Sequence, residues 1–214
     1  MTPPAPRTTT EHENLDRAVA SVAACHRTFP QVRHEHPHVE SESRVVVNVH
    51  EREYPAPPSE VAFLMASLSS SHDRLWPDER WPRMKLDSGL TVGGTGGHGP
   101  VRYRVESLDR TRKVIFRFTG PSGFDGWHSF EVIDLDGATT LLRHELRMRT
   151  RGWARLTWPL FFRPLHDALL EDALDKAARE LRTPLTSPHR TRWWPRLLRW
   201  LATKVGAARR KAKN

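Results

Sequence analysis

The sequence predicts an α+β domain in which a long C-terminal helix covers one face of an antiparallel sheet. Residues 101–148 alternate apolar and charged side chains with a period of two, which is typical of strands with one buried face. Residues 163–181 place apolar side chains at helical spacing instead. The chain has 214 residues, 37 % of them hydrophobic, and a single cysteine, Cys25. This composition predicts one core without disulfides or cysteine-rich metal sites.

The first elements are expected to begin at Arg44. The β-branched run Val45–Val49 predicts a strand, and the Pro55–Pro58 stretch ends it. Ser59 and Glu60 then open a short helix. The apolar side chains on one face of this helix are Val61, Leu64, Met65 and Leu68.

A long connection follows from residue 69 to residue 99 and contains Trp76, Trp81 and a glycine cluster. Connections of this length are usually functional or contain short helices. The run Gly94–Gly99 satisfies the G-x-G-x-x-G pattern of dinucleotide sites. Pro100 and an alternating strand follow it, however, where such a site needs a helix. We therefore expect a flexible entrance loop.

The first predicted hairpin has its turn at residues 108–111. This turn places Tyr103 opposite Phe116 and Val105 opposite Val114, so that all four side chains lie on one face.

The second predicted hairpin turns at Asp136–Ala138. It places Val132 opposite Leu142 and Phe130 opposite His144. The four strands would then form a sheet with one covered face and one solvated, arginine-rich face.

The closing helix is expected from Arg163 to Leu181, where Pro184 soon follows. Its inward stripe consists of His166, Leu170, Ala173, Leu174, Ala177 and Leu181. Asp167, Glu171, Asp175 and Arg179 line the other side, so that no inward carboxylate is expected beside the histidines.

This order of strand, proline-started helix, long connection, antiparallel meander and closing helix resembles the START-like superfamily. That superfamily, often labelled SRPBCC, includes the birch pollen allergen and the polyketide cyclase/dehydrase and lipid-transport group. The resemblance covers residues 44–183. It implies a helix-grip fold, in which a curved sheet wraps around the terminal helix and encloses a hydrophobic cavity. It also implies binding of lipids, polyketides or hormones, and in some members cyclisation or hydrolysis, but it transfers no catalytic residue.

Four histidines, His98, His128, His144 and His166, are expected to converge on the interior. They can be buried side chains satisfied by neighbours, polar anchors for a ligand oxygen, or a metal or acid–base site. For catalysis the candidates are His128 and His144, and we expect neither a metal site nor a cofactor. The side chains expected to line the cavity are Trp76, Trp81, His98, Tyr103, Phe116, Phe118, His128, Phe130, His144, Leu146, His166 and Leu170.

Two terminal segments flank the predicted domain at residues 44–184. Residues 1–43 are expected to be disordered. Residues 185–214 are predicted to form a basic amphipathic tail, because the stretch from His189 to Asn214 contains nine Lys and Arg and no Asp or Glu. The 25 Lys and Arg before His189 equal the 25 Asp and Glu in number, so residues 1–188 are formally neutral. The side chains expected to meet an anionic membrane surface are Trp194, Arg196, Leu197, Arg199, Trp200 and Leu201.

The leading functional hypothesis is a binder or carrier of a hydrophobic small molecule held between sheet and helix. Two alternatives stay open: a cyclase/dehydrase-type enzyme with an inward histidine as base, and a membrane-surface interaction module with a filled core. We expect a cytoplasmic protein, peripheral to the membrane if the tail binds there, and no nucleic-acid partner. The alternative to membrane binding is that the tail only keeps the protein soluble. The sequence leaves the oligomeric state open.

Overall fold

The computed structural model describes residues 44–184. The predicted disordered segment (1–43) and the predicted membrane-binding tail (185–214) lie outside the described residues. No helix within residues 44–184 is both long and apolar enough to span a membrane.

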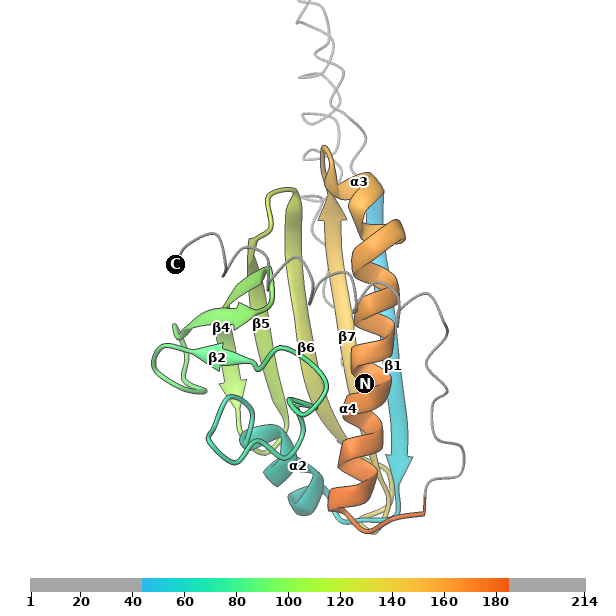
Figure 1. Cartoon of the computed structure of the whole chain (residues 1–214). Coiled ribbons are helices and arrows are strands. Elements are labelled where there is room, and N and C mark those ends of the chain that lie inside the picture. The colour runs from blue at the N-terminus through green and yellow to red at the C-terminus, as the bar shows by residue number, and fades with distance from the viewer. Residues whose placement is uncertain (1–43, 185–214) are drawn as a thin grey trace, which may run out of the picture. The chain divides into compact units, whose positions relative to one another are not determined.

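One antiparallel sheet of seven strands forms the body of the described domain, in the order β1-β7-β6-β5-β4-β3-β2. The helix α4 lies along one face of this sheet beside β1 and β7 (Figure 1). The predicted α+β architecture is confirmed. The elements are β1 (Arg44–Tyr54), α2 (Pro58–Ala66), β2 (Lys85–Leu86), β3 (Thr95–His98), β4 (Val101–Asp109), β5 (Lys113–Gly120), β6 (Phe124–Asp134), β7 (Thr140–Thr150), α3 (Ala154–Thr157), the π-helical turn η1 (Trp158–Phe162) and α4 (Arg163–Glu180).

The prediction of a flexible glycine loop was wrong. Thr95–His98 forms strand β3, which pairs with β2 on one side and β4 on the other. Gly96 shows why glycine is needed there, because a Cβ at this position would overlap the carbonyl oxygen of Lys85 on β2. The glycine run therefore lets neighbouring backbones approach closely, and the long connection contains short strands where short helices were considered.

The register of the first hairpin also differs from the prediction. Tyr103 lies opposite Phe118 and Val105 opposite Phe116, because a bulge at Glu106 and a turn at residues 110–112 shift the pairing by two. A shift of two keeps the inward face unchanged, so the side chains still point as expected. In the second hairpin the predicted pairs Val132–Leu142 and Phe130–His144 are confirmed.

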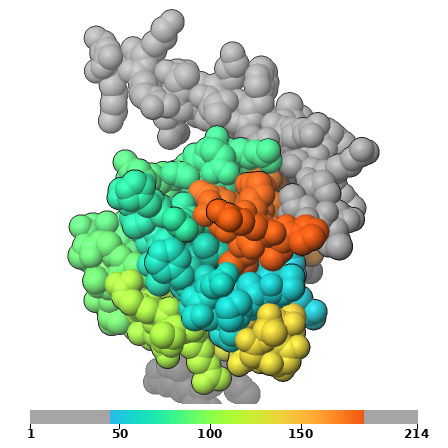
Figure 2. Space-filling view, turned by 90° about the horizontal axis from the view of Figure 1, so that it is seen from below, coloured from blue at the N-terminus to red at the C-terminus, as the bar shows by residue number. Residues whose placement is uncertain are grey.

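The core lies between the inner face of the sheet and α4, and the connection 69–99 completes it. Leu75, Trp76, Trp81 and Met84 from this connection are buried in the same cluster as the sheet and helix side chains. A second cluster, which includes Phe118, Phe124, Leu146, Met148 and Trp158, lies toward α3. Seen from below, the cyan segments from the first part of the described domain lie between the orange end of α4 and the yellow β6–β7 turn (Figure 2).

Candidate functional site

A continuous row of rings crosses the interior of the domain; we call His98, Tyr103, His128, His144 and His166 the imidazole row. His98 Nδ1 lies 3.2 Å from the hydroxyl of Tyr103, and the Tyr103 ring meets that of His128 edge-on at 5.0 Å. His128 Nδ1 lies 3.2 Å from His144 Nε2, and the rings of His144 and His166 are 5.0 Å apart. The predicted convergence of four histidines therefore takes the form of a line across the core.

The histidines of this row are uncharged. Burial lowers the pKa of His128 and His144 well below 6.5, and their histidine neighbours add to the effect. For the same reason the pKa of His98 falls to about 3. Burial also lowers the pKa of His166, against an opposing contribution from Asp167.

The pair His128–His144 leaves one nitrogen at each end without a hydrogen-bond partner among residues 44–184. These atoms are His128 Nε2 and His144 Nδ1. Their side chains are 4 % and 1 % exposed. A buried polar atom without a partner costs about 1–3 kcal/mol, and most such atoms in proteins are satisfied. The middle of the row therefore offers hydrogen-bonding capacity that the protein itself does not use.

Aromatic side chains surround the two rings. Phe116 and Phe118 stack against His128 with centroids at 4.9 and 5.1 Å, and Phe130 meets His144 edge-on at 4.7 Å. The predicted lining residues are buried on this inner face, except for His98 and His166, which are half-buried.

A second polar feature joins β1 to α4; we call it the β1–α4 seam. Asn48 Nδ2 donates to Asp167 Oδ1 at 2.9 Å, and Arg52 donates to Asp175 Oδ1 at 2.5 Å and to Glu171 Oε2 at 3.0 Å. Two residues of a strand advance about 6.7 Å and four residues of a helix about 6 Å, so alternate residues of β1 meet successive turns of α4. The expectation that Asp167, Glu171 and Asp175 point away from the interior was wrong, because β1 presents a polar inner face to them.

His50 lies at the centre of the seam, and both of its ring nitrogens meet carboxylates. Nδ1 is 2.8 Å from Glu171 Oε1, and Nε2 is 3.1 Å from Asp167 Oδ1. Burial alone would lower the pKa of His50, but the hydrogen bonds and charges of the two carboxylates raise it to about 9. The pKa of Asp167 is lowered, because hydrogen bonds from His166, His50 and Asn48 outweigh its burial. His50 is therefore an imidazolium at neutral pH.

The seam also contains a possible set of metal ligands. His50, His166 and Asp167 place one ligand atom each within 4.8 Å of one another, and no ion is present. Nitrogen and carboxylate ligands of this kind suit zinc or another transition metal. A metal ion would have to displace the proton that His50 shares with Asp167, so the set serves as an ion-pair network in the structure described here.

Sequence reasoning missed His50, Arg52 and Asp172. The signal was the alternation of Asn48, His50, Arg52 and Tyr54, set against carboxylates spaced by four on the helix. Asp172 is 3 % exposed and accepts hydrogen bonds from Trp81 Nε1 at 2.8 Å and from Arg80 at 3.1 Å.

The connection 69–99 is tied to α4 by polar contacts. Besides the bond from Trp81 to Asp172, Lys176 Nζ donates to the carbonyl oxygen of Trp76 at 2.6 Å. Trp76 Nε1 donates to the carbonyl oxygen of Pro82 at 3.0 Å, and its ring meets that of His98 at 4.6 Å. Both indoles lie inside the core.

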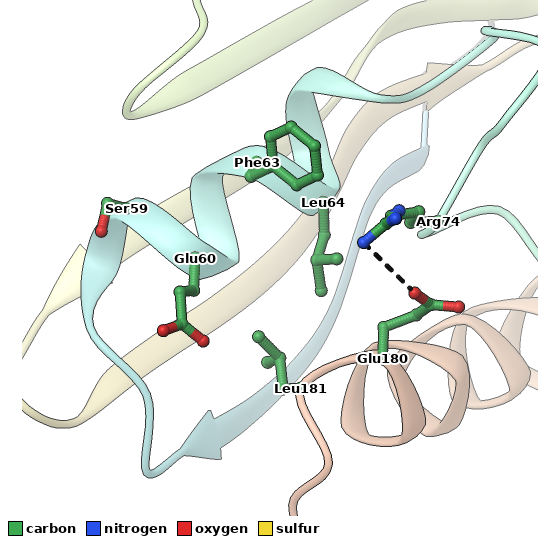
Figure 3. A pocket seen from close by; sticks show the side chains of 7 residues that line it. All are labelled: Ser59, Glu60, Phe63, Leu64, Arg74, Glu180 and Leu181. Carbon is green, nitrogen blue, oxygen red and sulfur yellow. Dashed lines mark ion pairs between the residues drawn. The ribbon is translucent and has the colours of Figure 1, made fainter.

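A groove of about 240 Å³ lies outside this interior, between α2 and the end of α4 (Figure 3). Arg74 and Glu180 approach to 3.8 Å across it, and Arg74 also lies over the ring of Phe63. The other side chains that line the groove are Ser59, Glu60, Leu64 and Leu181, and none of its lining residues was predicted to line the cavity. The groove is therefore separate from the imidazole row.

No protein-family model and no curated protein sequence matches this chain. Solved structures do match in fold. Norcoclaurine synthase from Thalictrum flavum, solved as a point mutant with a transition state analogue, is 12 % identical with a TM-score of 0.51. That match covers 65 % of this chain and 96 % of the enzyme.

Two further structures agree with this result. The Zhui aromatase/cyclase from a Streptomyces species is 16 % identical with a TM-score of 0.50, over 65 % of this chain and 97 % of its own. A protein from Thermobifida fusca is 18 % identical with a TM-score of 0.50, over 68 % and 99 %. The helix-grip fold, and with it the resemblance to START-like proteins, is confirmed at the level of the fold.

Proposed function

We propose that the protein binds a hydrophobic small molecule with at least one hydrogen-bonding oxygen, held between the sheet and α4. The observation that carries this proposal is the His128–His144 pair, whose outer nitrogens have no partner within the described domain. Apolar surroundings with a few convergent polar groups are the usual composition of small-molecule sites.

The chemistry of the pair defines what it can bind. One hydrogen bond joins two neutral imidazoles, so one ring donates and the other accepts. In either tautomer the two outer nitrogens then comprise one N–H donor and one acceptor. A hydroxyl can use either, whereas a carbonyl oxygen can use only the donor, and a carboxylate would find no positive charge in the row.

The comparisons support the class of ligand only. Two proteins of this fold are by name an aromatase/cyclase and norcoclaurine synthase, and the second holds a transition state analogue. A protein of this fold can thus hold a small organic molecule, and the identity of the molecule for this chain is left to experiment.

Binding is favoured over cyclase or dehydrase chemistry by the electrostatics of the pair. A general base works best with a pKa near the operating pH. Burial holds the pKa of His128 and His144 well below that range, so both are weak bases that act better as hydrogen-bond partners.

Entry of a ligand would require movement of the connection 69–99. Trp76 and Trp81 belong to the core cluster beneath α4, and their ties to α4 are the contacts with Lys176 and Asp172. We infer that these contacts set the rate of ligand exchange, because they must break before the indoles can leave the core.

The first test is native mass spectrometry of the full chain purified without detergent, followed by extraction of bound molecules. The expected result is a stoichiometric apolar molecule with a hydroxyl or carbonyl group. In parallel, calorimetry measures the binding of naphthol and of methylnaphthalene. The two compounds differ only in that naphthol has a hydroxyl where methylnaphthalene has a methyl group. One hydrogen bond of about 1–1.5 kcal/mol predicts a preference for naphthol of about tenfold.

The matched variants are His128→Leu/His144→Leu and, as a control, the exposed His72→Leu. The double variant should lose the preference for naphthol and keep binding of methylnaphthalene, while the control behaves as wild type. An empty protein that binds neither compound would overturn the proposal, as would a preference that survives in the double variant.

A further inference from the structure

The segment between β7 and α4 is apolar on two sides. Its inner stripe, Ala154 and Trp158, is buried in the second core cluster, and the half-buried Phe162 packs against it. Its outer side chains are exposed: Trp153 by 81 %, Leu156 by 56 %, Leu160 by 52 % and Phe161 by 47 %. We call these four side chains the α3–η1 face. A core requires only one apolar stripe of a surface helix, so the second stripe is evidence for a contact outside the domain.

The chain is rich in arginine around the segment that carries this face. Five arginines and no acidic residue lie between Arg147 and Arg163. Arg151 pairs with Asp125 at 3.0 Å and Arg163 with Asp167 at 3.7 Å, but both arginines are 61 % exposed. Exposed pairs of this kind are weak and screened by solvent, so these guanidinium groups can exchange their partners for other anions.

We propose that the α3–η1 face docks onto an anionic lipid membrane. The four apolar side chains would enter the boundary between headgroups and acyl chains, and the exposed Arg151 and Arg163 of the same segment would contact lipid phosphates. Exposed aromatic and aliphatic side chains together with arginines are the composition of helices that lie in a membrane interface.

Charge decides between a membrane and the other possible occupants. A symmetric contact between two copies would bring the same arginines together, and like charges oppose such an interface. Residues 189–214 carry nine Lys and Arg and no acid, so this segment is repelled as well. A nucleic acid would satisfy the arginines but would leave the leucines in water.

The α3–η1 face lies far from the point where residues 181–184 end the described domain. α3 lies near the end of β7, whereas α4 runs from there to the opposite end of the sheet (Figure 1). The eighteen residues of α4 span about 27 Å. The α3–η1 face is also independent of ligand binding in the interior, because its side chains point outward.

The test is sedimentation of the full chain with vesicles of equimolar phosphatidylcholine and phosphatidylglycerol, and with vesicles of phosphatidylcholine alone. Wild type should bind the anionic vesicles. Trp153→Ala/Leu156→Ala should bind them about tenfold more weakly, because membrane affinity scales with the apolar area inserted. Arg151→Gln/Arg163→Gln should lower the affinity several-fold and reduce its dependence on salt.

The matched control is Phe63→Ala/Leu135→Ala, which removes two apolar side chains of 59 % and 48 % exposure from other parts of the surface. It should bind vesicles as wild type does, and all variants should keep the wild-type thermal midpoint. Equal binding by wild type and Trp153→Ala/Leu156→Ala would overturn the proposal, since another segment would then carry it. A wild type that binds no vesicles but forms a dimer that this variant abolishes would assign the face to a second copy.

Discussion

The helix α4 meets two different environments on neighbouring stripes of its surface. Toward the centre of the sheet it presents His166 and Leu170 to a row of neutral rings. Toward β1 it presents Asp167, Glu171 and Asp175 to a histidine and an arginine. Buried histidines occur on both sides, so the two regions can be compared with the residue type held constant.

The comparison shows that neighbours, and not burial alone, decide the charge of a buried histidine. In the imidazole row burial lowers the pKa of His128 and His144, and no carboxylate opposes it. In the seam two carboxylates outweigh the same effect and raise the pKa of His50 to about 9. His166 lies between the two regions and receives both influences.

The largest expected effect is destabilisation of the protein by acid through the imidazole row. His128 and His144 have folded-state pKa values below the 6.5 of the unfolded chain, so the unfolded chain binds more protons below pH 6.5. Their contribution to the free energy of unfolding is complete above pH 6.5 and falls with decreasing pH. At pH 5 the unfolded-chain pKa of 6.5 limits the loss to at most about 2 kcal/mol for each ring.

Urea unfolding followed by tryptophan fluorescence at pH 7 and pH 5 measures this loss. His128→Leu/His144→Leu should lose less stability between pH 7 and pH 5 than wild type does, by at most about 4 kcal/mol, because both rings that resist protonation are gone. The exposed His72→Leu should lose as much stability as wild type. If the double variant loses as much stability as wild type, the two rings are not the neutral groups described above.

A smaller effect of opposite sign is expected from the seam. The folded-state pKa of His50 is about 9, above the 6.5 of the unfolded chain. Its stabilising contribution is therefore complete below pH 6.5 and is lost as the pH rises through 9. The full difference corresponds to about 3 kcal/mol, which solvent screening at this half-buried position reduces to about 2 kcal/mol.

Unfolding of wild type and His50→Gln at pH 6, 8 and 10 separates this contribution from other groups. The difference in the free energy of unfolding between wild type and His50→Gln should be largest at pH 6 and should vanish by pH 10. A difference that is constant with pH would mean that His50 stabilises by packing and not by charge.

Much of the imidazole row could be predicted from sequence because it depends on local pairing. The turn at Asp136–Ala138 determines the register of one hairpin, and this register makes His128 and His144 neighbours. The periodicity of the closing helix likewise identified α4 and the inward position of His166. The bulge at Glu106 was missed, because the change of inward positions from Tyr103 and Val105 to Leu108 falls where the sequence predicted the turn.

The seam was missed because it depends on contacts between elements far apart in the chain. The valines of β1 predicted the strand, yet Val45, Val47 and Val49 are the exposed side chains of its outer face. The inner face is polar, and its partners lie about 120 residues away on α4. Sequence spacing alone does not determine which strand lies beside which face of a helix.

The smallest effect concerns an ion pair on the other face of β1. Glu51 alternates with His50 and Arg52 and points outward, where it accepts a bond from Arg143 Nε at 2.8 Å. Its side chain is 46 % exposed and that of Arg143 35 %, whereas Arg52 and Asp175 in the seam are 25 % and 9 % exposed.

Double-mutant cycles with Glu51→Gln/Arg143→Gln and Arg52→Gln/Asp175→Asn measure the coupling energies of the outer and the inner pair. The outer pair should couple by less than about 0.5 kcal/mol and the inner pair by about 1.5–2 kcal/mol, because water screens only the former. Equal coupling on the two faces would show that the seam is as solvated as the surface, and the raised pKa of His50 would then lose its physical basis.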